Sequence, residues 1–292
     1  MPYLVLIFGV FCCSTSVIFI KIGGTDPVVL SAYRLIIGGL CLLPLSLRAR
    51  QHADCPAFSK LIRRALPPAF FLGIHFITWI AGARLTPAAN ASLIVNMVPV
   101  VMPLLLLVIL KERITRPEGL GTVAAITGVL LLGIGDLNLS SEYALGDAVC
   151  FLSMLFYAFY LIFGRKNRDL SSIYLYVVPV YLLAGIFCLS IAVVFELLGW
   201  EVVWFGSDTG TELVSILGLA LVPTVFGHSI INWALRSIRG QAVVIINLAQ
   251  FIFAGIMGFL LLGEIPHAVF YLASTLVVAG AIVVIRHSRT TP

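Results

Sequence analysis

The sequence predicts an all-α integral membrane protein in which ten transmembrane helices form two inverted five-helix repeats. Three observations lead to this prediction: a shortage of charge, ten long apolar runs and an internal repeat. Apolar residues make up 61% of the 292 residues and charged residues only 11%. A soluble domain carries roughly 25% charged residues, so most of the chain is expected to lie in a lipid bilayer. The net charge of +5 is spread over short segments between apolar runs, which indicates no nucleic-acid partner.

Each apolar run is long enough to cross a membrane, which takes about 20 residues of helix. The runs predict helices at 2–22, 28–47, 65–84, 87–110, 118–136, 144–164, 173–196, 212–235, 241–262 and 267–286. The first run lacks a basic start and a small-residue cleavage site, so we expect it to remain as a helix. The third begins with Pro67 and Pro68, and the fourth contains Pro99 and Pro103. The prolines make these two spans the least clearly marked, and those of the fourth are expected to break the helix where it borders a cavity.

Lys and Arg concentrate on one side of the predicted membrane domain. The loops after the second, fourth, sixth and eighth runs and the C-terminal tail carry five, three, three, two and two of them. On the opposite side only Lys21 and Arg84 occur, and Arg34 falls inside the second run. Since cytoplasmic loops carry the excess of Lys and Arg, both termini are expected in the cytoplasm, with the chain spanning the plasma (bacterial inner) membrane.

Two segments five helices apart are similar to each other. Segment 78–112 aligns with segment 232–264, and the Trp-to-Glu spacing is 33 in the first and 31 in the second. The aligned pairs are Trp79 with Trp233, Ala88 with Ala242 and Glu112 with Glu264. Five is odd, so the second copy must be inverted, which divides one membrane domain into repeats at 1–136 and 144–286. Inverted repeats are typical of secondary transporters, which bind substrate near mid-membrane between the halves.

Four segments carry a resemblance to a known family. They are STSVIFIKIGGTDPVVLSAYRLIIGGLCLLPL at 14–45, LTPAANASLIVNMVPVVMPLLLLVILKERITRPEGLGTVAAITGVLLL at 85–132, GDAVCFLSMLFYAFYLIFGRK at 146–166 and LLLGE at 260–264. Because of the order and spacing of these segments, the chain resembles the drug/metabolite transporter superfamily. The resemblance is to its ten-helix form, which is built from two EamA-type repeats. The resemblance implies export of small metabolites and places Lys21 and Arg34 at motif positions. The family's usual Pro in the ninth helix is replaced by Gln250-Phe251, so paired kinks of the fourth and ninth helices do not follow from the sequence.

Polar side chains within the apolar runs are the candidate substrate-binding residues, because an unpaired polar group in a bilayer costs several kcal/mol. The candidates are Arg34, His75, Trp79, Ser92, Asn96, Tyr157, Tyr160, His228, Asn232, Asn247 and Gln250. Converging aromatics and amides would suit a small amphipathic solute such as an amino acid or an aromatic metabolite. The alternatives are simple packing for the aromatic residues, interhelical hydrogen bonding for Asn96, and a buried, satisfied ring for each His.

For the charged residues near the apolar runs, the sequence predicts several different roles. Arg34 lies about two turns into the second helix, where insertion costs about 2.5–3.5 kcal/mol, so it should pair with backbone carbonyls or attract an anion such as a carboxylate. Lys21 could extend to the outer surface. Glu112 and Glu264 are expected to have structural roles, for instance an ion pair of Glu112 with Arg113 or Arg116. Without an acid at mid-span, the sequence offers no plain proton relay, and the coupling ion stays open.

The function expected from these features is a secondary transporter that exports a small-molecule substrate by alternating access. A carrier of phosphorylated or nucleotide-linked sugars and a non-catalytic lipid-flipping or scaffold subunit are the alternatives. An enzyme is not expected, because no H-E-x-x-H or G-x-S-x-G pattern occurs. The six cysteines lack metal-ligand spacing, so no metal or cofactor is expected. Gly121, Ala125 and Gly128 would allow close helix packing, within the chain or in a homodimer.

Overall fold

The computed structural model describes residues 2–51, 55–86, 88–136, 143–257, 259–260 and 268–287, apart from the side chains of 88–90 and 132–136. These residues are helical or in short connections. The first half contains α1 (Pro2–Ser14), α2 (Ser16–Ile22), α3 (Pro27–Ala49), α4 (Phe58–Leu85), α5 (Ala88–Val95), α6 (Val98–Leu110) and α7 (Arg116–Asp136). The second half contains α8 (Ala144–Lys166), α9 (Tyr174–Leu197), α10 (Thr209–Leu219), the π-helix η1 (Ala220–His228), α11 (Ser229–Ser237), α12 (Gly240–Asn247), α13 (Gln250–Met257) and α14 (Ala268–His287).

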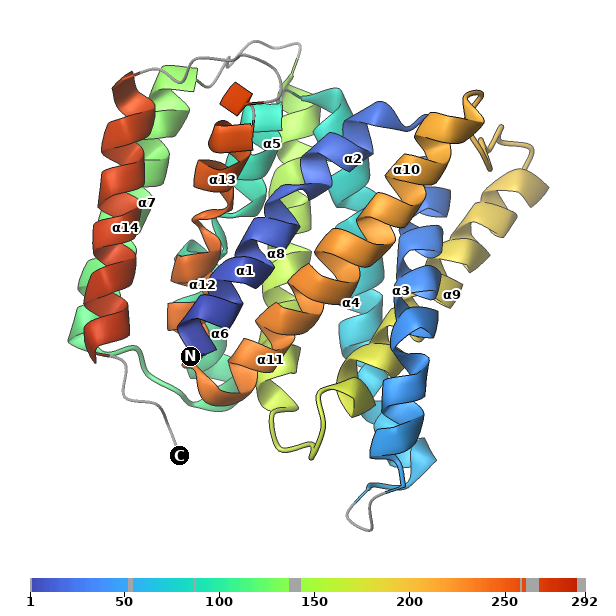
Figure 1. Cartoon of the computed structure of the whole chain (residues 1–292), viewed down its shortest axis with the longest axis horizontal. Coiled ribbons are helices and arrows are strands. Elements are labelled where there is room, and N and C mark those ends of the chain that lie inside the picture. The colour runs from blue at the N-terminus through green and yellow to red at the C-terminus, as the bar shows by residue number, and fades with distance from the viewer. Residues whose placement is uncertain are drawn as a thin grey trace.

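The helices have the length and surface of membrane-spanning segments. In the described part of the chain, nine segments are long and apolar enough to cross a bilayer, and α7, which lies along α14 in Figure 1, provides the tenth helix. Large apolar side chains point outward: Leu4, Leu104 and Leu120 are 72%, 64% and 69% exposed. Such a surface suits lipid rather than water. The predicted ten-helix membrane fold is therefore confirmed.

The two halves run through the bundle in opposite directions. In Figure 1, α5 and α6 lead from the upper end of the bundle to the lower end, whereas α12 and α13 lead from the lower end to the upper. These four helices contain the segments that align with each other in the sequence. The predicted inversion of the second repeat is visible in this arrangement.

Helix α4 begins earlier than the sequence indicated, at Phe58 rather than residue 65. Pro67 and Pro68 lie inside it without ending it. Each Pro removes one helical hydrogen bond to the carbonyl four residues before it, so the affected carbonyls belong to Arg63 and Arg64. Arg63 is exposed and Arg64 is partly exposed, so water can satisfy these carbonyls. The helix therefore continues beyond the apolar run.

Several spans are interrupted near the middle of the bundle. Helix α5 gives way to α6 at Asn96 and Met97, where the sequence predicted a break because of Pro99. The ninth span also breaks, between α12 and α13, although it lacks the Pro. The first span is interrupted at Thr15, where hydroxyl groups of Ser14 and Thr15 bond to carbonyls three residues before them. Such bonds compete with the regular helix.

The eighth span contains the nine-residue π-helix η1, which no sequence pattern indicated. Pro223 lies in it, and the Thr224 hydroxyl donates to the Leu219 carbonyl over 2.8 Å. The π-helical turn ends at His228, whose side chain faces the middle of the bundle. Short π-helical segments frequently occur at functional sites.

The small-residue stripe of α7 packs against α14 of the same chain. Gly121, Ala125 and Gly128 are buried there, and a Cβ atom placed on Gly121 would lie 2.6 Å from the Gly280 carbonyl oxygen. A Cβ on Gly128 would lie 2.7 Å from the Ala273 carbonyl oxygen. The stripe is thus used for close helix packing within one chain and offers no surface to a second copy. A homodimer through another surface stays a prediction.

Candidate functional site

A small cavity lies where the broken helices of the two halves meet. It consists of two adjoining hollows that share Cys13, Trp79, Asn96 and Gln250. The other lining residues are Ser14, Ser16, Val17, His75, Ser92, Val95, Tyr157, His228 and Ala254. The larger hollow has about 30 Å³ of free volume, room for one or two water molecules. We call this space the central cavity.

Irregular backbone borders the central cavity from both halves. Ser14 and Ser16 flank the interruption of the first span, Asn96 follows the end of α5, and Gln250 begins α13. Backbone that leaves the regular helix inside a membrane protein is tolerated where it is buried or borders a cavity, because its polar groups need partners. The cavity therefore combines polar groups from both repeats in the middle of the fold.

Seven of the eleven predicted site residues line the central cavity. They are His75, Trp79, Ser92, Asn96, Tyr157, His228 and Gln250. The other four, Arg34, Tyr160, Asn232 and Asn247, are buried but are not among the lining residues. Sequence reasoning missed Cys13, Ser14 and Ser16, although three consecutive hydroxyl residues in the first apolar run were a usable signal.

Aromatic rings form one wall of the cavity. The His75 ring stacks on the Tyr157 ring at 4.6 Å, and the His228 ring meets Tyr157 edge to face at 5.6 Å. His75 Nδ1 lies 2.8 Å from Ser153 Oγ, so this ring has a hydrogen-bond partner, as expected for a buried His. Trp79 Nε1 donates to Ser16 Oγ over 3.2 Å. Flat aromatic surface and a few polar atoms are typical of small-molecule sites.

A chain of amide groups crosses from one half to the other. Asn96 Nδ2 donates to the Ser92 carbonyl over 2.7 Å, and Asn247 Nδ2 donates to Asn96 Oδ1 over 3.3 Å. Gln250 Nε2 then donates to Asn247 Oδ1 over 2.7 Å. Asn96 thus fits both interpretations made from the sequence, since it bonds to the other half and also lines the cavity. The chain connects the break of the fourth span with that of the ninth.

Tyr160 and Asn232 lie beside the cavity and bond to each other. Asn232 Nδ2 donates to Tyr160 Oη over 2.5 Å and to the His228 carbonyl over 2.7 Å. Both side chains are fully or almost fully buried. A Cβ on Gly164 would lie 2.5 Å from Asn232 Oδ1, so only a glycine allows Asn232 this position. The pair holds α8 against α11 behind the cavity wall.

Arg34 is fully buried behind the same aromatic wall. Its Nε donates to Thr224 Oγ1 over 3.1 Å, and its guanidinium carbon lies 3.8 Å from the centre of the Phe76 ring. Within the described residues, neither Nη1 nor Nη2 has a hydrogen-bond partner. Of the two expectations for Arg34, pairing with backbone carbonyls is wrong, since a hydroxyl group and an aromatic face are the contacts. Attraction of an anion stays a prediction.

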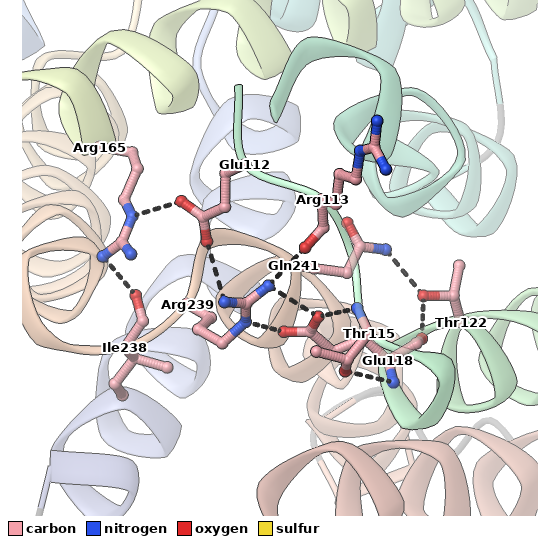
Figure 2. Close-up of polar contacts among 9 residues, drawn as sticks. All are labelled: Glu112, Arg113, Thr115, Glu118, Thr122, Arg165, Ile238, Arg239 and Gln241. Carbon is pink, nitrogen blue, oxygen red and sulfur yellow. Dashed lines mark hydrogen bonds and ion pairs between the residues drawn. The ribbon is translucent and has the colours of Figure 1, made fainter. Parts of the chain in front are cut away.

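A cluster of four charged residues joins the halves at the end of the bundle that holds the N-terminus (Figure 2). Glu112 and Glu118 come from the first half, and Arg165 and Arg239 from the second. Arg165 Nε lies 3.4 Å from Glu112 Oε2, and Arg239 Nη1 lies 3.7 Å from Glu112 Oε1. Arg239 also donates to both oxygens of Glu118, one of them over 3.0 Å. We call these four residues the charged cluster.

The predicted ion pair of Glu112 with Arg113 or Arg116 is wrong. Lys111 ends α6 in a left-handed conformation, with φ of 58°, and this turn is followed by Glu112, which pairs with the second half. Arg113 and Arg116 are exposed, and Arg113 contributes only its carbonyl, which accepts from Arg239 Nη2 over 2.8 Å. Glu264, the counterpart of Glu112 in the second repeat, lies outside the described residues.

Three members of the charged cluster, Glu118, Arg165 and Arg239, are held by further hydrogen bonds. Glu118 and Thr115 form a capping box at the start of α7, in which the Thr115 N–H donates to Glu118 Oε2 over 2.7 Å. Arg165 Nη1 donates to the carbonyls of Leu235 and Ile238 over 2.8 and 3.0 Å. The hydrogen bonds to Glu118 raise the pKa of Arg239 above its usual value. These bonds hold the charged side chains in position, so the cluster joins the two halves and closes this end of the bundle.

Gln241 extends this closure toward the broken fourth span. Its Nε2 donates to Thr122 Oγ1 over 2.7 Å and to the Pro99 carbonyl over 3.2 Å. Pro103 has no N–H, so the Pro99 carbonyl lacks its usual helical partner and is free for this contact. The prolines of the fourth span therefore create an acceptor that the second half uses. Sequence reasoning missed Gln241.

A second polar network joins the halves at the opposite end. Thr25 Oγ1 donates to Glu212 Oε2 over 2.6 Å, and Thr86 Oγ1 donates to Asp147 Oδ1 over 2.6 Å. Lys21 Nζ donates to the Thr86 carbonyl over 3.2 Å. Lys21 is exposed, and its expected extension toward the outer surface stays a prediction. Because both ends are joined, the central cavity lies between two closures.

Comparisons with known proteins agree with this architecture. A model of the EamA-like transporter family matches residues 1–134 and 144–286. An uncharacterized transporter of Archaeoglobus fulgidus is 23% identical over 95% of this chain and 94% of its own length. The uncharacterized transporter YdfC of Bacillus subtilis is 25% identical over 94% of this chain and 87% of its own length. A solved crystal structure with 16% identity covers 99% of this chain and 98% of its own, with a TM-score of 0.77.

Proposed function

Because the chain belongs to the EamA-like transporter family, we propose that it is a secondary transporter that exports small metabolites by alternating access. The proposal is carried by one observation: polar and aromatic groups of both inverted halves converge on a cavity between two inter-half closures. In transporters built from inverted repeats, substrate binds near mid-membrane where the repeats meet. The function is binding and release of a solute, without catalysis.

Alternation requires that the two closures open in turn. With the charged cluster intact and the opposite network released, the cavity would open at the end of the bundle opposite the charged cluster. With the opposite network intact and the charged cluster released, the cavity would open at the end that holds the charged cluster. About 30 Å³ of free volume is too small for an amino acid or an aromatic metabolite, so substrate entry requires one closure to separate. The chain would then move substrate as the halves rock about the cavity.

The orientation proposed from the basic residues places the charged cluster on the cytoplasmic side of the bacterial inner membrane. The described connections rich in Lys and Arg lie at the end of the bundle where α1 begins and α14 ends (Figure 1). Cytoplasmic segments carry such an excess. Export then means that the solute enters after the charged cluster opens and leaves after the opposite network opens.

The proposal is tested by metabolite efflux from bacterial cells that produce the protein. The medium is profiled for amino acids and other small metabolites, against cells with an empty vector. We expect one chemical class to rise outside the cells. We expect Trp79→Ala and Asn96→Leu to reduce this rise at least about tenfold at equal membrane levels, because each removes a polar or aromatic group from the cavity.

Two outcomes of this experiment would change the proposal. No change relative to the empty vector would contradict export and would favour a lipid-flipping or scaffold subunit. A rise that both variants leave intact would keep export but would contradict the role of the central cavity. Arg63→Gln is the matched control, since this base is exposed at the start of α4, away from the cavity. It should leave efflux unchanged.

A further inference from the structure

Unsatisfied polar groups gather behind and within the aromatic wall of the central cavity. In native proteins, the large majority of buried polar atoms have a hydrogen-bond partner. Among the described residues, Arg34 Nη1 and Nη2, Tyr157 Oη and His228 Nδ1 have none. Arg34 and Tyr157 contribute N–H and O–H donors, and the His228 nitrogen is a donor in one of its tautomers.

Two of these groups, those of Arg34 and His228, contact one aromatic ring, that of Phe76. The guanidinium carbon of Arg34 lies 3.8 Å from the centre of the Phe76 ring, and the His228 ring meets Phe76 edge to face at 5.0 Å. Tyr157 and His228 both line the cavity. The Phe76 ring thus contacts both Arg34 and His228, and His228 is a lining residue. Because Arg34 does not line the cavity, its contact with a solute requires the wall to move, as it must when a closure opens to admit the solute.

The charge of this region is positive and uncompensated. No Asp or Glu in the described part of the chain contacts Arg34, and none is among the residues that line the cavity. A buried charge without a partner is costly. A cationic solute would lack a carboxylate partner and would be repelled by Arg34. A carboxylate would instead supply acceptors for the two free nitrogens.

We infer that the transported solute is an organic anion whose carboxylate binds the Nη atoms of Arg34, with its apolar or aromatic body against Trp79, His75 and Tyr157. The inference rests on the proposed function and narrows it from small metabolites in general to carboxylates with net negative charge. A single guanidinium, with no Lys or Arg among the lining residues, fits a monocarboxylate better than a doubly charged phosphate. Zwitterionic amino acids are poorer substrates, because their ammonium group lacks a carboxylate partner.

The test is equilibrium binding to the purified full-length chain with pairs of ligands that share one body and carry either a carboxylate or its neutral amide. The pairs are indole-3-acetate with indole-3-acetamide, benzoate with benzamide, and lactate with lactamide. We expect the carboxylate of at least one pair to bind about tenfold or more tightly than its amide, because hydrogen bonds to charged groups are the stronger ones. Arg34→Gln should remove this preference, and Arg34→Lys should keep part of it.

Further variants and measurements distinguish loss of the anion site from misfolding and from loss of transport. Arg63→Gln should keep the full preference, and Tyr157→Phe should weaken it severalfold with an unchanged unfolding temperature. No preference for any carboxylate, or a preference that survives Arg34→Gln, would overturn the inference. If efflux of neutral or cationic metabolites still depends on Trp79 and Asn96, the transporter proposal stands and the anion site fails. If no metabolite leaves the cells, the proposed function fails first.

Discussion

Glu112→Gln is expected to open the central cavity at the end of the charged cluster, which the proposed orientation places in the cytoplasm. Glu112 joins Arg165 and Arg239 across the halves, with its oxygens 3.4 and 3.7 Å from their nitrogens. The neutral amide keeps the shape of the side chain but removes the ionic attraction to both bases. Loss of a partly buried ion pair costs on the order of 1 kcal/mol or more, which shifts an equilibrium about five- to tenfold. The fraction of molecules open to the cytoplasm should rise by that factor.

Cys13 reports this opening, because it lines both hollows of the cavity and is 5% exposed. The measurement is its rate of reaction with a membrane-impermeant maleimide in inside-out vesicles, with the other five cysteines replaced by Ala. We expect the rate to rise about five- to tenfold in Glu112→Gln. Arg113→Gln is the matched control, since the Arg113 side chain is exposed and only its carbonyl joins the cluster. Equal rates in wild type and Glu112→Gln would show that the cluster does not govern access.

Gly121→Ala is expected to destabilise the protein, whereas Gly119→Ala two residues away is not. A Cβ on Gly121 would lie 2.6 Å from the Gly280 carbonyl oxygen, and backbone cannot move aside as a side chain can. A Cβ on Gly119 would meet only Ile114, at 3.9 Å. Overpacking costs about 1–3 kcal/mol, whereas an unstrained Gly→Ala change stabilises by about 0.4–1 kcal/mol.

The pair is compared by thermal unfolding of the purified protein in detergent. Gly121→Ala should lower the unfolding temperature, and Gly119→Ala should leave it equal or slightly raised. Because both positions lie in α7 and both changes add one methyl group, the difference isolates the packing of α7 on α14. If Gly121→Ala unfolded at the wild-type temperature, the two helices would not be as close as the structure has them.

The helices and their inversion could be predicted because lipid imposes a simple rule on the sequence. Each span must be apolar over its whole length, so its limits are visible at residues such as Lys111 and Arg165. The break at Asn96 could be predicted because Pro99 marks it. The break at Leu248 could not, since no Pro marks it and its polar neighbours, Asn247 and Gln250, bond to each other.

The partners of charged side chains could not be predicted, because they come from distant parts of the chain. Glu112 has bases beside it in sequence, yet it pairs with Arg165 and Arg239. The cause is local, since the left-handed Lys111 ends α6 just before Glu112, but a left-handed Lys has no sequence signal. Arg34 likewise contacts Thr224 of the π-helix η1, an element that no periodicity indicated. The polar candidates lining the cavity were found more easily, because a polar residue in an apolar run is itself the signal.

Alternating access through the central cavity is tested most directly by locking the charged cluster. Cysteines replace Glu112 and Arg165 in the background without the other cysteines and are joined by a short, reducible cross-linker. Efflux of the metabolite class that leaves cells with the wild-type protein is then measured before and after reduction. We expect complete cross-linking to abolish efflux and reduction to restore it, because the cavity must open at this end for solute to enter. Efflux that continues in fully cross-linked protein would contradict alternating access between these two halves.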